Sequence, residues 1–373
     1  MQIRSLRIAC ARHCLFCGLL ALVGKREGEI VMDAHHLRFS KLKPQDKTEG
    51  GYRIKSTRSN FPVLENMALY KLVLHKQGVR EPHWHPNADE LGYCLKGRVL
   101  VSFFGNKNAK ETFVVNEGEV FLIPSGALHS IENIGKDTAE LLAQFNHHQP
   151  EDFGLSSTFG MFSDAVLGNT WNIPSNHFQP MQRSLKASFI SKLSKSSPLS
   201  NEYHYTSSYR FALEASQPLL SNEGGCAKMA RQNVWPILKK QALYSLNLTG
   251  KGMREPHWHP ETAELGYVAS GKGKMSILFP QGQLETYEME EGDIYFIPKA
   301  YPHHIENLTT SSLHVLVFFD QPMPQDIGFT ASVKSFSNES LSAIMDCPAQ
   351  VFEKLPTYFE DLFIVNKKNP LDK

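Results

Sequence analysis

Two stretches of this chain repeat the same alternation of apolar and polar residues. Apolar side chains recur with a period of two in residues 68–74, and the same spacing returns in residues 242–248. This alternation is typical of a strand with one buried face. Other short apolar runs predict further strands, at residues 95–104, 120–123 and 141–145 in the first stretch and at 274–279, 294–297 and 314–319 in the second.

Glycines divide these runs, at Gly97 and Gly118 in the first stretch and at Gly271 and Gly292 in the second. Many short strands with frequent turns predict an all-β fold, either a sandwich or a barrel. Residues 156–200 and 335–362 carry helical spacing instead. We therefore expect a small helical appendage after each β-domain.

A constant offset of 174 positions relates the two stretches. It links Pro62 to Pro236, Tyr70 to Tyr244, Gly97 to Gly271, Pro124 to Pro298, Asn133 to Asn307 and Gly154 to Gly328. A unit of this length is too large for a solenoid repeat, so the chain is predicted to be a tandem pair of domains. We expect a first domain at residues 35–190, a linker at 191–205, a second domain at 206–362 and a tail at 363–373.

Composition narrows the expected partners. The 373 residues carry a net charge of +1, so there is no basic excess to bind nucleic acid or an acidic membrane surface. Residues 1–31 form a leader in which three arginines precede a short apolar run at 14–24. Two interpretations stay open. The leader is a signal peptide of an exported protein, or it is an untranslated extension of a cytoplasmic protein that starts at Met32.

The strongest chemical signal is the frame Arg-Glu-Pro-His-Trp-His, at residues 80–85 and again at 254–259. In each copy a glutamate and a later histidine follow at matched spacings. Histidines at positions i and i+2 of a strand point to the same face. The sequence therefore predicts two metal centres, with the ligands His83, His85, Glu90 and His129 in the first and His257, His259, Glu264 and His303 in the second.

The donor set also narrows the choice of metal. Three imidazoles and one carboxylate leave two positions open on an octahedral ion, which suits Mn(II) or Fe(II) better than tetrahedral zinc. We expect two ions per chain, with Mn(II) preferred and Fe(II) as the alternative. His304 is expected to point away from the metal, because its neighbour His303 keeps the register with His129.

These motifs carry a family resemblance. Residues 83–97, His-x-His-x4-Glu-x6-Gly, resemble the first cupin motif, and residues 118–133, Gly-x5-Pro-x-Gly-x2-His-x3-Asn, resemble the second. The second repeat matches both, with Ala300 in place of one glycine. The chain is thus similar to bicupins, and most similar to their oxalate decarboxylase branch. The resemblance implies two tandem cupin (jelly-roll) β-barrels and a homo-oligomer.

In that branch, the arginine three residues before the first histidine ligand holds the substrate carboxylate beside the metal. Arg80 and Arg254 stand at this position. The role suits a guanidinium, which stays charged and binds a carboxylate through two parallel hydrogen bonds. The alternative is a structural arginine that caps its own loop or pairs with Glu81 or Glu255.

The chain departs from the branch at its proton donors. Leu155 stands where a lid segment should carry a glutamate, and Ala143 and Val317 stand where a buried glutamate is expected. Decarboxylation needs a group that protonates the product carbon. Asp152 and Asp326, at one lid position in the two repeats, are the remaining catalytic candidates, although an aspartate near a glycine is commonly a turn residue.

Two classes of function follow. The first is a metal-dependent enzyme that acts on a small carboxylate such as oxalate, by decarboxylation or by oxidation. The second is a metal-containing bicupin that binds or isomerises a small sugar or keto acid without decarboxylase activity.

Overall fold

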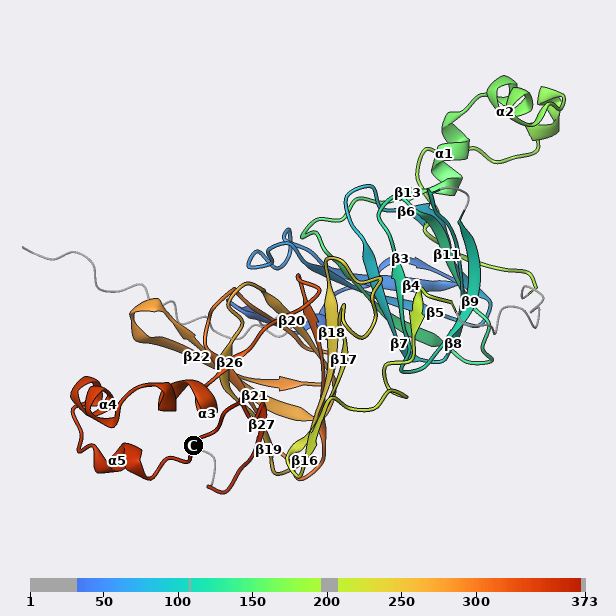
Figure 1. Cartoon of the computed structure of the whole chain (residues 1–373). Coiled ribbons are helices and arrows are strands. Elements are labelled where there is room, and N and C mark those ends of the chain that lie inside the picture. The colour runs from blue at the N-terminus through green and yellow to red at the C-terminus, as the bar shows by residue number, and fades with distance from the viewer. Residues whose placement is uncertain (1–31, 107–108, 196–206, 370–373) are drawn as a thin grey trace, which may run out of the picture.

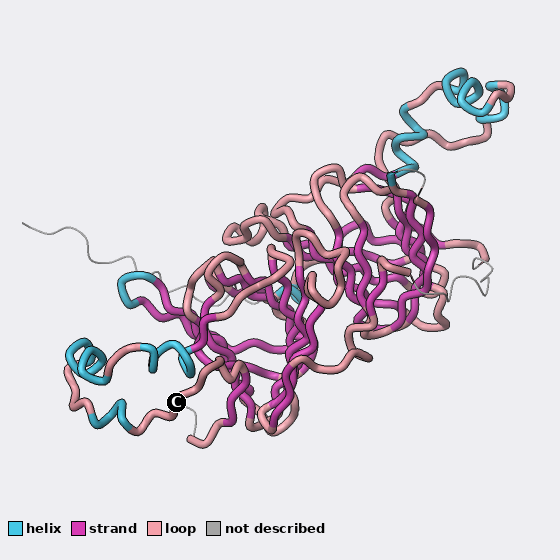
Figure 2. Tube along the Cα trace, in the orientation of Figure 1, coloured by secondary structure: helices cyan, strands magenta, loops and turns pink. Residues whose placement is uncertain are grey.

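The computed structural model describes residues 32–106, 109–195 and 207–369. The leader predicted at residues 1–31 and most of the predicted linker lie outside these ranges. Within them, two β-domains lie side by side, and their helical segments project at opposite ends of the molecule (Figures 1 and 2). Among the described helices, none is long and apolar enough to cross a membrane.

Each domain consists of two sheets, so the all-β prediction is confirmed, although the sheets are not joined into a closed barrel. The first domain has one sheet in the order β15 (Arg210–Phe211), β10 (Val120–Ile123), β7 (Glu90–Lys96), β12 (Ala139–Phe145), β5 (Ala68–Leu74), β4 (Gly51–Ser56), β3 (Gln45–Thr48). Its second sheet has the order β13 (Phe153–Gly154), β6 (Gly78–Trp84), β11 (Leu128–Asn133), β8 (Arg98–Phe104), β9 (Lys110–Asn116), with β14 (Ile190–Lys192) also beside β6.

The second domain repeats this topology. One sheet has the order β1 (Met32–Asp33), β2 (His36–Leu37), β23 (Ile294–Ile297), β20 (Glu264–Ser270), β25 (Leu313–Phe319), β18 (Ala242–Leu248), β17 (Gly225–Ala230), β16 (Leu220–Asn222). The other has the order β22 (Gln283–Glu290), β21 (Lys272–Phe279), β24 (His303–Asn307), β19 (Gly252–Trp258), β26 (Ile327–Gly328), with β27 (Ile364–Asn366) also beside β19.

Two sequence expectations need correction. The run at residues 95–104 is not one strand, because Gly97 has a φ of +87° and turns the chain between β7 and β8. Residues 364–366, predicted as part of the tail, form strand β27 and pair with β19, so they belong to the second domain.

The helical appendages also follow the offset between the repeats. The first contains α1 (Leu155–Met161), α2 (Asp164–Trp171) and η3 (Ser175–Phe178); the second contains α3 (Phe329–Ser332), η6 (Val333–Ser335), α4 (Asn338–Met345) and α5 (Gln350–Glu353). Ser163 and Ser337 cap the N-termini of α2 and α4 through their side-chain oxygens. Short 3-10 turns, η1 (Phe39–Lys41) and η5 (Pro280–Gly282), complete the described helical elements.

Each repeat gives its first strand to the sheet of the other repeat. β2 pairs with β23 of the second domain, and β15 pairs with β10 of the first. The offset of 174 relates His36 to Arg210, so the exchange is symmetric. It brings His36 Nε2 to 3.0 Å from Asp293 Oδ2, and both side chains are buried.

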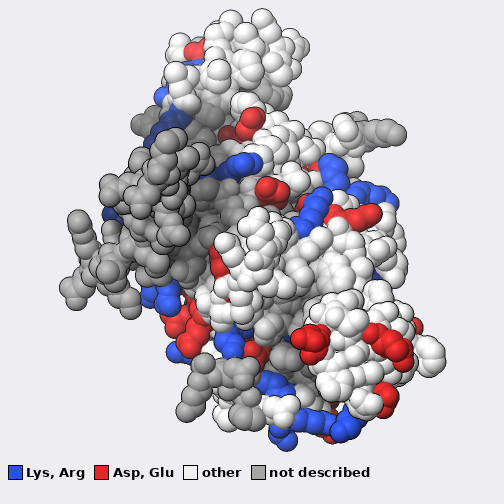
Figure 3. Space-filling model, turned by 90° about the vertical axis from the view of Figure 1, so that its left-hand side faces the viewer, with Lys and Arg blue, Asp and Glu red and all other residues white. Residues whose placement is uncertain are grey.

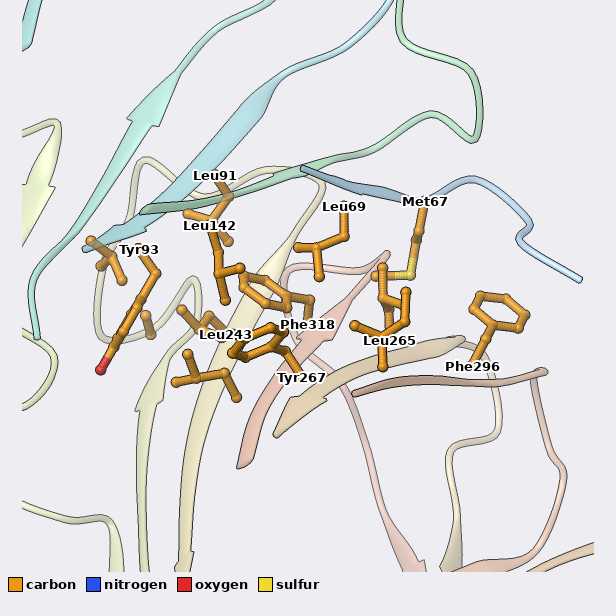
Figure 4. Close-up of a cluster of buried hydrophobic side chains, with 14 of the residues drawn as sticks. Met67, Leu69, Leu91, Tyr93, Leu142, Leu243, Leu265, Tyr267, Phe296 and Phe318 are labelled. Carbon is orange, nitrogen blue, oxygen red and sulfur yellow. The ribbon is translucent and has the colours of Figure 1, made fainter. Parts of the chain in front are cut away.

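A continuous apolar core joins the two domains (Figure 4). Matched side chains from both repeats meet there, among them Leu69, Leu91, Tyr93 and Leu142 from the first and Leu243, Leu265, Tyr267 and Leu316 from the second. At roughly 1.5–3 kcal/mol for each fully buried large apolar side chain, this contact strongly favours a fixed arrangement of the domains. The exchanged strand adds Leu37 to the same core.

We expect Leu37→Ala to destabilise the protein by about 2–5 kcal/mol, because Leu37 is 1% exposed and the cavity left behind cannot fill easily. The loss of stability should appear first in the second domain, although Leu37 lies at the start of the first repeat in the sequence. Amide hydrogen exchange of the variant checks this, because the amides of β23 should exchange faster than those of β10. An equal increase of the exchange rate in both strands would contradict the pairing of β2 with the second domain.

Candidate metal centres

The four predicted ligands of each repeat converge. Their donor atoms lie within 4.8 Å of one another in both sets, and all eight side chains are buried. The fold explains the convergence in the first repeat, because β6 and β11 are neighbours and place His83 directly opposite His129. His85 follows the end of β6, and Glu90 begins β7. In the second repeat His257 and His303 are paired in the same way.

All six histidines are held in one tautomer. Each Nδ1 lies 2.6–2.9 Å from a backbone carbonyl oxygen, those of Glu81, Glu151 and Ala127 in the first repeat and those of Glu255, Gln325 and Tyr301 in the second. A carbonyl only accepts, so Nδ1 carries the proton and Nε2 presents a lone pair to the centre. This orientation is typical of histidines that ligate a metal.

The donor chemistry fits a divalent cation. His85 Nε2 is buried without a hydrogen-bond partner, 3.2 Å from Glu90 Oε2. Burial, together with Arg80, holds the pKa of His83 well below its usual range, so this imidazole is neutral. Burial alone would raise the pKa of Glu90, but the adjacent imidazoles of His129 and His85 hold it below its usual range. A cation between these groups would satisfy neutral imidazole nitrogens and an ionised carboxylate together.

The two centres differ in one contact to the carboxylate. Tyr295 donates a hydrogen bond to Glu264 Oε1 at 2.6 Å, and both groups are buried. The offset places Phe121 at this position in the first repeat, where no such bond is available.

As expected, His304 points away from the metal ligands, with its Nε2 3.1 Å from Glu306 Oε1.

Beside each centre, an arginine holds a carboxylate. Arg80 Nη2 donates to both oxygens of Asp152, at 2.7 and 2.6 Å, and Arg254 Nη2 donates to Oδ1 of Asp326. In the first repeat Arg53 joins the pair, with its Nη1 2.7 Å from Asp152 Oδ2. Burial would raise the pKa of Asp152, but Arg80 and Arg53 lower it to about 2. Asp152 is therefore ionised at neutral pH and is a poor proton donor in this arrangement.

Glu81 binds backbone N–H groups and does not pair with Arg80. Its carboxylate accepts from the N–H of Ser156 at 2.9 Å and from that of Phe189 at 2.6 Å. These residues start and end the helical appendage, so Glu81 ties both ends of it to β6. Gly154 is required by this close approach, since a Cβ there would lie 2.5 Å from Glu81 Oε1.

Glu255 repeats this arrangement in the second domain. Its carboxylate accepts from the backbone N–H of Thr330 at 2.9 Å and of Phe363 at 2.7 Å. The carbonyl of Phe363 in turn accepts from Arg254 Nη1 at 3.0 Å. Each frame therefore holds both ends of its own appendage.

A small cavity lies against each set of ligands. Each has a volume of about 20 Å³, room for about one water molecule. Ala143 and Val317 line the cavities, as the motif positions predict, whereas Leu155 is not among the lining residues. Tyr70 and Tyr244 also line them. Sequence reasoning assigned no role to these tyrosines, although their match at the repeat offset was a usable signal.

Comparison with known proteins agrees with the fold and the motifs. The cupin family model matches residues 38–179 and 211–345. Among curated proteins, the oxalate decarboxylase OxdC of Bacillus subtilis is 26% identical over 355 residues, which cover 91% of this chain and 87% of that protein. A probable oxalate decarboxylase of Arthroderma benhamiae is 25% identical over 317 residues, covering 82% of this chain and 77% of that protein.

Solved structures give the same fold. The structure of oxalate decarboxylase from Bacillus subtilis at pH 4.6 superposes with a TM-score of 0.80 at 24% identity, covering 92% of this chain and 90% of that one. At this identity the likeness concerns the fold.

We expect one metal ion at each set of ligands. Replacing Glu90 or Glu264 with Ala should remove one ion of the two, because the carboxylate is the anionic ligand of its set. Elemental analysis of the purified variants checks the stoichiometry. Loss of both ions from either single variant, or of none, would contradict two independent centres.

The low pKa of Asp152 predicts a pH dependence of stability. A carboxyl group with a pKa lowered from 3.8 to about 2 stabilises the fold above pH 3.8 and loses that contribution as the pH falls towards 2. The loss amounts to about 2 kcal/mol. Urea unfolding of the unmodified protein and of Asp152→Asn should therefore give a stability difference that shrinks between pH 5 and pH 2. A constant difference would show that Asp152 has an ordinary pKa.

Proposed function

The chain belongs to the cupin family, and on that premise we propose that it is a manganese-dependent bicupin enzyme that acts on a small carboxylate, with oxalate as the first candidate. Fe(II) is the alternative metal. The observation that carries the proposal is the carboxylate of Asp152 on Arg80, beside three imidazoles and Glu90. Arg80 already binds a carboxylate there, and that of a substrate would take the place of Asp152.

The chain's own residues bind and orient this substrate. Arg80, and Arg254 in the second domain, would hold one carboxylate group through charge-assisted hydrogen bonds. Burial raises the pKa of the Tyr70 phenol, so Tyr70 stays protonated and can donate a hydrogen bond to an anion. Leu72, Ile131 and Phe145 line the same cavity with apolar surface, which limits the water around a bound substrate. A bound metal ion supplies Lewis-acid and redox chemistry.

The residues around the cavity favour oxidation over decarboxylation. Decarboxylation of oxalate gives CO2 and formate, and it requires a proton on the product carbon. Ala143 lines the first cavity without a proton to give, and Asp152 is ionised. Oxidation instead converts oxalate to two CO2, while dioxygen takes up two electrons and two solvent protons to become hydrogen peroxide. This route needs no carbon-directed acid.

The size of the cavities supports a small substrate. About 20 Å³ of free space beside each set of ligands leaves little room for a sugar, whereas oxalate needs only the volume freed when Asp152 moves. Basic and acidic side chains are interspersed on the face drawn in Figure 3, so the charge of this face does not indicate a different class of ligand.

Assembly into a homo-oligomer is also part of the proposal. Apolar side chains of the first appendage are exposed, including Met161 at 69%, Phe162 at 51% and Trp171 at 52%. Contact with another copy would remove this apolar area from water.

The test is incubation of the Mn-loaded protein with oxalate while CO2, formate and peroxide are measured. Loss of turnover in Arg80→Lys or Arg254→Lys, with metal content intact, would identify the domain that acts, because lysine cannot make the paired contact. Absence of all three products from the unmodified protein would refute the proposal.

We expect the unmodified protein to make little formate, and Leu155→Glu to raise the formate yield at least about 10-fold. A positioned acid contributes about 10² to 10⁴ in rate, and residue 155 begins α1, directly after the segment that substrate must displace. Leu155→Gln is the matched control, with similar size but no acidic proton. Equal formate from both variants, or efficient formate release by the unmodified protein, would show that the donor lies elsewhere, with Asp152 and Asp326 next to be tested as Asn variants.

A further inference from the structure

We propose that Arg53 is a second substrate-binding arginine, present in the first domain only, which makes that domain the binding site for dicarboxylates. The proposal rests on the proposed function for the class of substrate. It arises from a difference between two sites built on the same frame of residues.

Arg53 lies on β4, is 3% exposed and lines the same cavity as His83 and Glu90. Its Nη1 is 2.7 Å from Asp152 Oδ2, and the same oxygen accepts from Arg80 Nη2 at 2.6 Å. Two guanidinium groups therefore converge on one carboxylate. A substrate carboxylate that replaced Asp152 would gain charge-assisted hydrogen bonds from both.

Arg53 is held in place independently of Asp152. Its Nε and Nη2 donate to Asp46 Oδ2 at 2.9 and 2.7 Å, and its guanidinium carbon lies 4.4 Å from the centre of the Phe189 ring. When Asp152 moves, Arg53 stays oriented by these contacts. The binding site is thus pre-organised for an anion.

The second domain lacks this group. The offset of 174 places Ala227 at the position of Arg53, Leu220 at that of Asp46 and Met229 at that of Lys55. Ala227 and Met229 are buried in the apolar core of that domain, and Leu220 packs against it. Asp326 instead pairs with Arg254 and lies 3.4 Å from His259 Nδ1.

The difference separates substrates by the number of carboxylates. Oxalate would direct one carboxylate towards an ion held by the four ligands and the other to the position between Arg53 and Arg80. Formate has a single carboxylate and cannot occupy both positions. The first domain should therefore prefer oxalate over formate much more strongly than the second.

The test measures binding to the full-length Mn-loaded protein, by calorimetry and by the Mn(II) resonance spectrum, with oxalate and formate as probes. We expect Arg53→Ala to weaken oxalate binding at one of the two sites by about 10- to 100-fold and formate binding by less than about threefold. Lys47→Ala is the matched control. It removes one positive charge from the neighbouring strand β3, where Lys47 is exposed, and should leave both affinities unchanged.

A second variant guards against misfolding, because Arg53→Ala leaves Asp46 unpaired. The double variant Asp46→Leu, Arg53→Ala installs the two residues that the second domain uses at these positions. Unchanged oxalate affinity in both variants, or an equal loss for formate, would overturn the proposal.

Binding and turnover also separate this proposal from the proposed function. Oxalate binding that depends on Arg53, without release of formate or peroxide, would refute the enzymatic function and leave the role of Arg53 standing. Normal turnover with oxalate affinity unaffected by Arg53→Ala would refute the role of Arg53 alone. An unmodified protein that binds no oxalate at either site would overturn both.

Discussion

The convergence of four electron-pair donors in each domain is the constraint on which the rest of the structure depends. Buried lone pairs that face one another are unfavourable unless a cation lies between them. The chain meets this cost with backbone carbonyls that fix all six imidazoles, such as the bond from His83 Nδ1 to the Glu81 carbonyl at 2.7 Å. Folding of each β-domain and binding of its ion are therefore coupled.

The frame that supplies two ligands also anchors the segments around them. At adjacent positions of β6, Arg80 binds Asp152 and Glu81 holds both ends of the helical appendage. Under the proposed function, a substrate carboxylate would compete with Asp152 for the same guanidinium. Displacement of Asp152 and recognition of the anion would then be one event, in which one carboxylate exchanges for another.

The sequence predicted features with a regular period and missed contacts that depend on the folded arrangement. The eight converging side chains and the all-β fold followed from spacing and alternation, because a metal centre and a strand each impose a fixed period. Arg53 gave no signal, since its partner Asp152 is far away in sequence and its counterpart is Ala227. The hydrogen bond from Tyr295 to Glu264 was also missed, because it depends on the pairing of two strands that the sequence does not show. The role of Glu81 became visible only once Ser156 and Phe189 lay beside it.

The exchange of first strands has a consequence for how such a chain arose. A protein with one repeat alone would carry a short strand with no place in its own sheet, beside a sheet edge that accepts the same strand from elsewhere. Two copies would satisfy each other and form a symmetric dimer. The present chain holds the same symmetric pairing within one covalent chain. A covalent link allows the two halves to differ, and here one site carries the pair Asp46 and Arg53 while the other has Leu220 and Ala227.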